Sequence, residues 1–246
     1  MRYFKLYYFI SHMEEQQHFD ELLFIAKQEK LAKSVKIHNE FNDINTIAGV
    51  DVAYNEQSSE VVGAITVLNA DTLEVLEVQT NIEPISFPYI PGLFSFRELP
   101  PLLSAFNKLT TVPDLIVCDG HGLAHPRRFG LACHLGVTLD IPTIGCGKSK
   151  LLGEFKELAK HRGATSDLID DDKIIGKVLR TQDNIKPVYV SIGHKVSLDT
   201  AVEWVLKLAS KYRLPETTRQ ADQLVNSTLK EHKEKTYEKP SVSHTH

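Results

Sequence analysis

Apolar and polar residues alternate along this chain in a pattern that predicts a sheet of several strands. Runs of β-branched and apolar residues predict the first three strands at residues 46–54, 61–69 and 73–82. Because the links between them are short, these strands are expected to pair as an antiparallel meander. Two more apolar runs, residues 115–118 and 142–146, enclose a helical pattern that opens at Pro126, and this order predicts a parallel βαβ unit.

Apolar residues at helical spacing predict the layers that cover this sheet. Such patterns occur in residues 14–36, from Ser95 onward, after Ser197, which is a favourable N-cap residue, and from Thr217 or Thr218 onward. Strands are also predicted at residues 172–181 and 187–192, whereas the polar residues 153–172 are expected to form a variable excursion. The sequence therefore predicts an α/β fold with a mixed central sheet of five or more strands flanked by helices.

The length and composition fit a single domain that spans residues 1–246. With 246 residues and 42% hydrophobic content, the chain can bury a full core. Residues 1–13 are expected to be an N-terminal extension, because Met13 offers a second start, and the polar residues 231–246 are expected to form a flexible tail. No stretch has the length of a membrane helix, so a cytoplasmic protein without a membrane partner is expected.

The net charge limits the kinds of partner that are expected, and the cysteine content limits the cellular compartment. The net charge of -4 gives no global basic field, so contact with a polyanion requires a local patch or bound metal ions. Such a patch is predicted near the βαβ unit from Arg127, Arg128, Lys148 and Lys150. The three cysteines, Cys118, Cys133 and Cys146, are odd in number and lie in apolar segments, so they are expected to be core residues in a reducing compartment.

Two aspartates are the first candidates for chemistry. Asp119 directly follows the predicted strand 115–118, and Asp51 lies between Val50 and Val52 in the first strand. A carboxylate in such surroundings is costly to bury unless it meets a cation or hydrogen-bond donors. The spacing alone leaves two interpretations open, a pair of hydrogen-bonded structural aspartates and a site for a divalent cation.

Two further acidic residues also have structural interpretations. Glu98 lies three residues after Ser95, so the two side chains can form a capping box, but Glu98 can equally be a metal ligand. Asp222 falls beside Arg219 in the predicted last helix, where an exposed helical aspartate is the commoner case. The sequence alone does not distinguish a structural role from a functional one for these two residues.

Histidines and one lysine near the βαβ unit are candidates for contact with a substrate. His125 follows a glycine-rich loop and precedes Pro126, so it can approach a ligand. His134 lies within a helical pattern, where a packed and hydrogen-bonded histidine is the expected case. Lys148 follows Gly147 at the end of a predicted strand and is either a solvated lysine or a cation that neutralises phosphate.

Residues 88–91, Pro-Tyr-Ile-Pro, form a stiff segment because both prolines fix φ and restrict the residue before them. A stiff loop with an aromatic side chain can act as a wedge that offsets the cost of unstacking a base. It can also be an ordinary loop held down by packing of Tyr89 and Ile90. Both interpretations stay open on the residues alone.

Several segments spread over the chain resemble the endonuclease V family. They are Ile47–Asp51, Pro88–Glu98, Asp119–Arg128, Pro142–Gly145 with Lys148, Gly193–His194 and Leu214–Arg219. The resemblance implies a ribonuclease H-like fold and an enzyme that nicks nucleic acid near deaminated purines. One departure is Cys146-Gly147 before Lys148, where larger or non-sulfur residues are usual in the family.

The resemblance also implies roles for individual residues. Asp51, Glu98 and Asp119 match the family's metal-binding carboxylates, and Asp222 matches a fourth acidic or histidine position of the catalytic site. His125 and Lys148 match catalytic residues that steady the phosphate and the nucleophile. The residues expected to contact DNA are Pro88, Tyr89, Ile90 and Pro91, which match the strand-separating wedge, together with Arg128. The residues expected to line a pocket for hypoxanthine are Gly92, Phe94, Gly120, Gly122 and Leu151.

By resemblance, the expected activity is DNA repair that depends on Mg²⁺, with Mn²⁺ able to substitute. The cut is expected at the second phosphodiester bond 3′ to deoxyinosine, leaving 3′-hydroxyl and 5′-phosphate ends. The expected partner is DNA containing deoxyinosine, inosine-containing RNA is the alternative substrate, and a monomer is the default. Two other classes remain open, a ribonuclease H-like nuclease with a different target and a nucleic-acid-binding protein without turnover.

Overall fold

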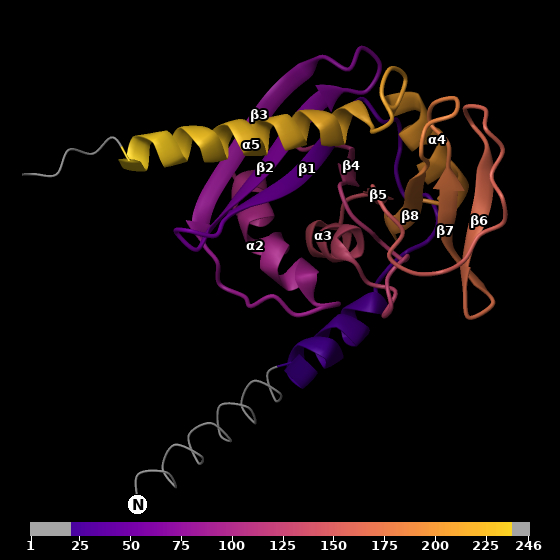
Figure 1. Ribbon diagram of the computed structural model, residues 1–246, viewed down its shortest axis with the longest axis horizontal. Helices are drawn as coiled ribbons and strands as arrows, with labels where there is room; N and C mark the ends of the chain where they lie inside the picture. The colour runs from indigo at the N-terminus through magenta and orange to yellow at the C-terminus, as the bar shows by residue number, and fades with distance from the viewer. Residues whose placement is uncertain (1–20, 238–246) are drawn as a thin grey trace, which may run out of the picture.

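The computed structural model describes residues 21–237 of the chain (Figure 1). The expected N-terminal extension, residues 1–13, and residues 238–246 of the expected tail lie outside the described residues. Residues 231–237 of that tail form the end of the last helix. Each helix within residues 21–237 is too short or too polar to cross a lipid bilayer.

The centre of the fold is an eight-stranded sheet with the strand order β3-β2-β1-β4-β5-β8-β7-β6. Along the chain the strands are β1 (Thr46–Asn55), β2 (Glu60–Asn69), β3 (Val75–Pro84), β4 (Leu115–Cys118), β5 (Thr143–Gly147), β6 (Thr165–Asp170), β7 (Lys173–Leu179) and β8 (Val188–His194). The pairs β1–β4 and β4–β5 are parallel, and the other neighbouring pairs are antiparallel. The predicted mixed sheet, its meander and its βαβ unit are confirmed.

Helices cover both faces of this sheet, as expected of a ribonuclease H-like α/β fold. They are α2 (Phe94–Phe106), α3 (Leu131–Leu139), α4 (Leu198–Leu208) and α5 (Glu216–Tyr237), and residues 21–32 are helical as well. The predicted cap of α4 is confirmed, because the Ser197 hydroxyl accepts a hydrogen bond from the Thr200 N–H at 3.3 Å.

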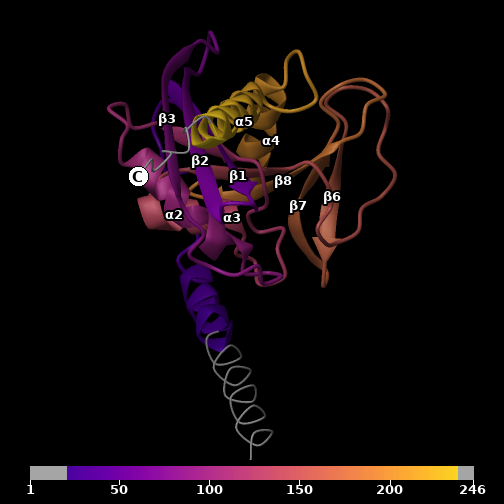
Figure 2. The same cartoon turned by 60° about the vertical axis from the view of Figure 1, so that its left-hand side comes forward.

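The period-two alternation of the strands decides which helix covers which face. In β1, Ala48 and Val50 pack into a core with residues of α2 and α3, whereas Ile47 points to the core under α4. In β2, Val62 packs against Val225 of α5. Figure 1 shows α5 lying along β1 and β2, and Figure 2 shows the same layers turned by 60°. Helices α2 and α3 therefore cover one face, and α4 and α5 the other.

Two local predictions are wrong. The polar stretch 153–172 contains the strand β6, which lies at the edge of the sheet and leaves much of its surface exposed, so it lacks an apolar pattern. Helix α3 begins at Leu131 instead of Pro126, because Arg128 has a left-handed backbone with a φ of 54°. A residue in that conformation cannot continue an α-helix. The turn instead lengthens the loop that carries His125.

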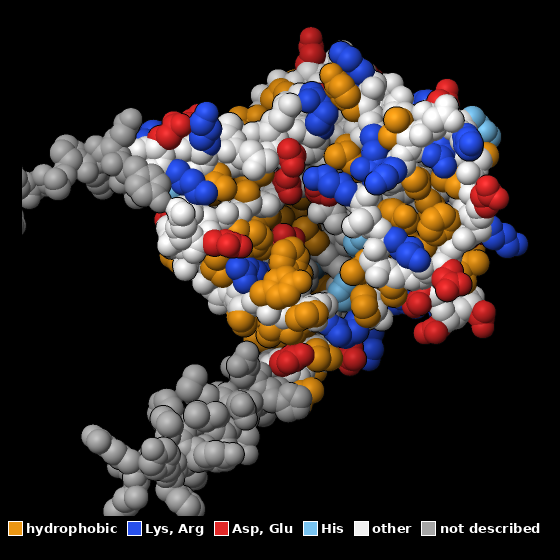
Figure 3. Space-filling view, in the orientation of Figure 1, with side chains coloured by type: hydrophobic (Ala, Val, Ile, Leu, Met, Phe, Trp, Pro, Cys, Tyr) orange, Lys and Arg blue, Asp and Glu red, His pale blue; other side chains and the backbone are white. Residues whose placement is uncertain are grey.

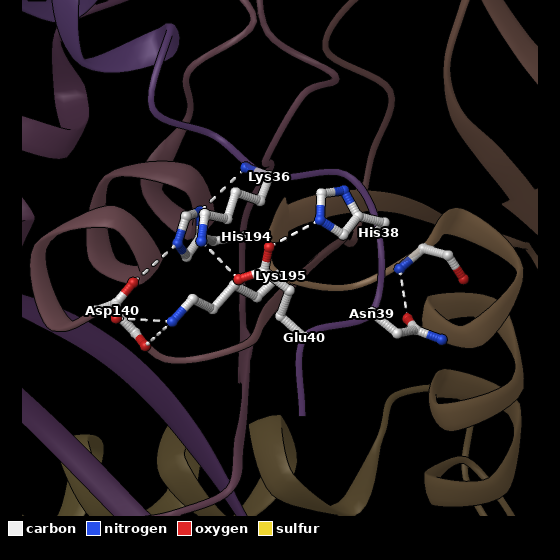
Figure 4. Close-up of polar contacts among 8 residues, drawn as sticks. Lys36, His38, Asn39, Glu40, Asp140, His194 and Lys195 are labelled. Atoms are coloured by element: carbon white, nitrogen blue, oxygen red, sulfur yellow. Dashed lines mark hydrogen bonds and ion pairs between the residues drawn. The ribbon is translucent and has the colours of Figure 1, made fainter. Parts of the chain in front are cut away.

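His194, at the end of β8, attaches the segment 36–40 to the sheet. Its Nδ1 accepts a hydrogen bond from the Lys36 N–H at 3.2 Å, and its Nε2 lies 3.4 Å from Asp140 Oδ1 (Figure 4). The Lys195 ammonium pairs with the same carboxylate at 2.7 Å. Burial lowers the pKa of His194, so the ring is neutral at pH 7 and carries its proton on Nε2. His194 therefore has a structural role in joining residues 36–40 to β8 and α3.

Candidate active site

Three aspartates from distant parts of the chain meet at one place on the sheet. The carboxylate oxygens of Asp51, Asp119 and Asp222 all lie within 4.8 Å of one another. Asp51 is in the middle of β1, Asp119 directly follows β4, and Asp222 lies in α5. Because β1 and β4 are parallel with Val50 opposite Cys118, the next residues of the two strands are neighbours.

The alternation of the strands also explains why α5 completes this group. Asp51 and Asp119 are an even number of residues after Ile47 and Leu115, which face the layer of α4 and α5. Gly49 lets α5 come close to β1, because a Cβ at this position would lie 2.0 Å from the Thr217 carbonyl oxygen. Asp222 follows Thr217 on the same helix, so it reaches the carboxylates of the two strands.

Burial and mutual repulsion hold protons on part of this site. Burial, followed by repulsion from Asp119, raises the pKa of Asp51 to about 7. Burial, followed by repulsion from Asp51 and Asp119, raises the pKa of Glu98 to about 8. Carboxylates that resist ionisation together and supply only hard oxygen donors fit a divalent cation such as Mg²⁺. The described residues therefore form a chemically suitable metal site.

Glu98 does not form the capping box that its spacing allows. Helix α2 begins at Phe94, one residue before Ser95, and its N-cap residue makes no side-chain cap. The Ser95 hydroxyl instead lies 3.0 Å from Nδ1 of His134, which is buried and packs against the Phe96 ring. The expected structural role of His134 is confirmed. Glu98 is 9% exposed and borders the three aspartates without belonging to their compact group.

Lys148 is the cation that faces the carboxylates. Its ammonium forms an ion pair with Asp119 and lies 3.5 Å from Asp222 Oδ1. Partial burial acts to lower the pKa of Lys148, but the hydrogen bond and the charge of Asp119 outweigh it, and the pKa is raised. The Arg213 guanidinium donates a hydrogen bond at 2.6 Å to the Lys148 carbonyl oxygen and so positions its backbone.

A cavity of about 540 Å³ opens beside the carboxylates and shares Glu98 and Asp119 with them. In Figure 3, acidic side chains and histidines are visible in a hollow near the centre of the molecule. Four of the five residues predicted for a base pocket line the cavity, namely Gly92, Phe94, Gly120 and Leu151. The fifth, Gly122, is buried outside the lining, where a Cβ would lie 1.9 Å from the Ile192 carbonyl oxygen. Gly122 therefore supports the cavity by close backbone packing.

Histidines form part of the cavity wall. Burial, followed by the charge of Arg127, lowers the pKa of His125 to about 4, so the ring is neutral at pH 7. Its Nδ1 accepts the Arg127 N–H at 3.2 Å, which leaves Nε2 as the donor. His121, to which the sequence assigned no role, also lines the cavity. Its position between two glycines after a strand was the signal that could have identified it.

The predicted wedge lies at the rim of the cavity. Tyr89, Ile90 and Pro91 contribute to the lining, whereas Pro88 does not. The Tyr89 side chain is 68% exposed, and its ring packs edge-on against Phe94 with the centroids 5.7 Å apart. An exposed aromatic residue on a rigid loop beside a cavity is suited to stacking on a base.

The predicted basic patch is smaller than its sequence suggests. Arg127 points inward and donates a hydrogen bond at 2.6 Å to the Gly92 carbonyl oxygen. Arg128 forms an ion pair with Asp170 at 2.6 Å. Lys148 pairs with Asp119 and Asp222, so among these four described residues Lys150 is the one whose exposed charge has no hydrogen bond or ion pair of this kind.

Both the sequence and the fold are similar to those of known proteins. The model of one protein family, described as endonuclease V, matches residues 29–223. The endonuclease V of Rippkaea orientalis is 50% identical over 200 residues, which cover 81% of this chain and 87% of the relative.

Solved structures extend the likeness to the fold. The endonuclease V of Streptomyces avermitilis has a TM-score of 0.84 at 45% identity, covering 87% of this chain and 94% of its own. The Ciona intestinalis endonuclease V, in complex with a 24mer DNA containing an inosine followed by a ribo-adenosine, has a TM-score of 0.76 at 26% identity. That likeness covers 87% of this chain and 99% of the Ciona chain.

Proposed function

Since this chain belongs to the endonuclease V family of nucleases, which hydrolyse phosphodiester bonds, we propose that it is a DNA repair enzyme specific for deoxyinosine. The proposed cut is at the second phosphodiester bond 3′ to the lesion and leaves 3′-hydroxyl and 5′-phosphate ends. One observation carries the proposal, namely that Asp119 belongs both to the carboxylate cluster and to the lining of the 540 Å³ cavity, which Glu98 also lines. A base held in that cavity places its own strand next to the carboxylates.

The proposed metal ligands are Asp51, Asp119 and Glu98, and Asp222 supplies the third carboxylate of the compact aspartate group. Mg²⁺, or Mn²⁺ in its place, would supply Lewis-acid activation of the attacking water and neutralise charge on the leaving oxygen. Asp51 and Glu98, whose pKa values are raised to about 7 and about 8, lose their protons more readily when a cation is bound.

Lys148 and His125 act on the strand through charge and hydrogen bonding. The ammonium of Lys148 is held between Asp119 and Asp222, from where it can neutralise a phosphate oxygen. His125 is neutral at pH 7, because its pKa is lowered to about 4, so it brings no positive charge to the strand and instead acts as a neutral hydrogen-bonding group that also bonds to the Gly92 backbone.

The cavity and the wedge both take part in recognising the base. Gly92, Gly120 and Leu151 line the cavity, where their backbone amides and carbonyls can contact the edge of hypoxanthine. Tyr89 occupies the gap that the extruded base leaves in the stack. Unstacking one base costs roughly a few kcal/mol, and stacking on an exposed ring offsets a cost of that size.

The test compares matched duplexes with and without one deoxyinosine, in Mg²⁺ and in EDTA. We expect cleavage of the deoxyinosine strand in Mg²⁺ at the second bond 3′ to the lesion, at least about 100-fold faster than cleavage of the matched strand. The variant Asp119→Asn should keep binding of the lesion and lose cleavage by a similar factor. Equal cutting of both duplexes contradicts lesion recognition, and a fully active Asp119→Asn enzyme contradicts the role of that carboxylate.

The same assay with inosine in an RNA strand tests the alternative substrate. Cleavage of RNA much faster than cleavage of DNA would make the chain an endoribonuclease at the same site. Binding of inosine-containing strands without cleavage of either would identify a non-catalytic binding protein.

A further inference from the structure

Gln28 in the helical segment 21–32 connects two loops that form the cavity. Its side chain is fully buried, and its Nε2 donates hydrogen bonds to the Gly92 carbonyl oxygen at 3.0 Å and to the Phe129 carbonyl oxygen at 2.8 Å. Its Oε1 accepts a hydrogen bond from Nε of Arg127. A buried amide with all three bonds satisfied fixes the atoms that it contacts, because each unmade bond leaves a buried polar group without a partner.

Phe24 holds the same loop through apolar contacts. It lies four residues before Gln28 and therefore on the same face of the helix. Its ring centroid is 4.7 Å from that of Phe87 and 5.0 Å from that of Phe96, both in edge-to-face geometry. Ile90, within the predicted wedge, packs against this cluster as well. One helical face thus presents an aromatic ring and an amide to the two ends of segment 87–92.

The loop has few other polar attachments. Two prolines remove backbone donors from segment 88–91, and its Leu93 N–H to Ile90 carbonyl bond, at 3.0 Å, is local. Within residues 21–237, the Gly92 backbone is where hydrogen bonds from Gln28, Arg127 and His125 converge on this loop. Gly92 itself has a φ of 80°, so its orientation depends on these donors and not on a helix or a strand.

From these contacts we infer that Phe24 and Gln28 are positioning residues for the wedge, so that the N-terminal helical segment sets how rigidly Tyr89 is presented to a duplex. The inference rests on the proposed function, and it names residues outside the cavity lining that act through Gly92 and Arg127. Figure 1 shows the helical segment 21–32 on the side of the molecule where the chain enters α2, which follows the wedge.

A duplex and a single strand make different demands on a wedge. In a duplex the wedge must hold two stacked neighbours apart, whereas an inosine in a single strand is already close to unstacked. A loosened wedge therefore slows cleavage of a duplex and leaves cleavage of a single strand nearly intact. A loss of global stability lowers both rates by the same factor.

The experiment uses the full chain and one oligodeoxynucleotide with a single deoxyinosine, as a single strand and as a duplex, in Mg²⁺. Gln28→Met keeps the size of the side chain and removes its hydrogen bonds, and Phe24→Leu weakens the aromatic contacts. Glu29→Gln, an exposed position on the same helix, is the matched control. We expect kcat/KM on the duplex to fall about tenfold in both variants, kcat/KM on the single strand to change less than about twofold, and the control to match the wild type.

A second readout does not depend on activity. Amide hydrogen exchange of residues 86–93 should become faster in Gln28→Met than in the wild type, without a change in β1 and β4. Equal losses on duplex and single strand, or unchanged exchange in residues 86–93, overturn the inference. If Gln28→Met does not fold, the same comparison for Phe24→Leu decides. A wild-type enzyme that ignores inosine refutes the proposed function, and the exchange measurement still decides whether Gln28 holds the wedge.

Discussion

Asp51 and Glu98 keep their charges only at a cost, because both are buried next to other carboxylates. Their pKa values are raised to about 7 and about 8, above the ordinary values of 3.8 and 4.5 that apply to the unfolded chain. At pH values between the ordinary pKa values and the raised ones, the unfolded chain has released these protons and the folded protein still holds them. A binding site of this kind opposes folding until a cation is present.

Metal-free protein should therefore lose stability as the pH rises. Well below the ordinary values of 3.8 and 4.5 both states hold the protons, so no difference arises, and from there to about pH 8 the free energy of unfolding should fall. Mg²⁺ binds the deprotonated carboxylates, so it should raise the melting temperature more at pH 8 than at pH 6. Thermal unfolding in EDTA and in Mg²⁺ across this range measures both effects.

Glu98→Gln is the control for this prediction. The variant should flatten the fall in stability between pH 5 and pH 8 in EDTA, because one of the two groups with a raised pKa is gone. If the variant and the wild type show the same dependence on pH in EDTA, Glu98 is not the source of it.

The residues of the site differ in how far the sequence could predict them. Asp51 and Asp119 lie in or directly after apolar strands, where a buried carboxylate is costly, so the sequence marks them as candidates but leaves a structural role and a metal site both open. Asp222 lies in a polar helix, and its place beside Asp51 depends on the packing of α5 against β1. Gln28 gave no signal, because one glutamine in an amphipathic helix is usually solvated, and its burial follows from long-range packing.

At the scale of elements, the contact between β1 and α5 decides whether the third aspartate reaches the site. This contact depends on a glycine, because a Cβ at Gly49 would lie 2.0 Å from the Thr217 carbonyl oxygen and 2.9 Å from the Thr218 nitrogen. Backbone atoms of a helix cannot give way as the end of a side chain can. The helix as a whole must move if this position carries a side chain.

Gly49→Ala should therefore displace α5 and weaken cleavage. We expect a loss of about 1–3 kcal/mol in the free energy of unfolding, and a fall in cleavage larger than that loss of stability explains under conditions where the variant is folded. Urea unfolding and cleavage of a deoxyinosine duplex at low temperature provide the two measurements.

Ala201→Gly in α4 is the matched control, since α4 packs away from the carboxylates. It should cost about 1 kcal/mol of stability and leave the rate of cleavage by folded protein unchanged. A Gly49→Ala enzyme that is less stable but cleaves at the wild-type rate would show that the position of α5 does not govern the chemistry.

Elements with a strong pattern of apolar residues could be predicted from the sequence. Elements whose position depends on contacts with other parts of the fold could not. The buried strands β1, β2, β4 and β5 have apolar runs that only a sheet core explains, and each is present near its expected bounds. The edge strand β6 has mixed burial and hence no periodic signal. The late start of α3 depends on the left-handed turn at Arg128, which the ion pair of that residue with Asp170 of β6 helps to hold.

At the scale of the whole molecule, charge sets how the protein can meet a polyanion. The net charge of -4 is unfavourable, and the carboxylate cluster adds local repulsion until cations are bound. Arg127, Arg128 and Lys148 have hydrogen-bond or ion-pair partners within the described residues 21–237. Few lysines and arginines near the site are therefore available for phosphates, and binding should depend on salt less steeply than for a strongly basic protein.

Lys150 offers the sharpest test of this view. It follows the site lysine closely along the chain, its side chain is exposed, and its ammonium lies 6.0 Å from the centroid of the Phe155 ring. A lysine of this kind contacts phosphate and carries no information about the base. Lys150→Gln should weaken binding of inosine-containing and plain duplexes by the same factor, and reduce the slope of log K against log salt by about 1 for each duplex.

Lys207→Gln in α4, which removes an exposed lysine paired with Asp71, is the control and should leave the slopes for both duplexes unchanged. Fluorescence anisotropy from about 50 to 200 mM salt measures them, and a loss confined to the inosine duplex would instead place Lys150 at the base.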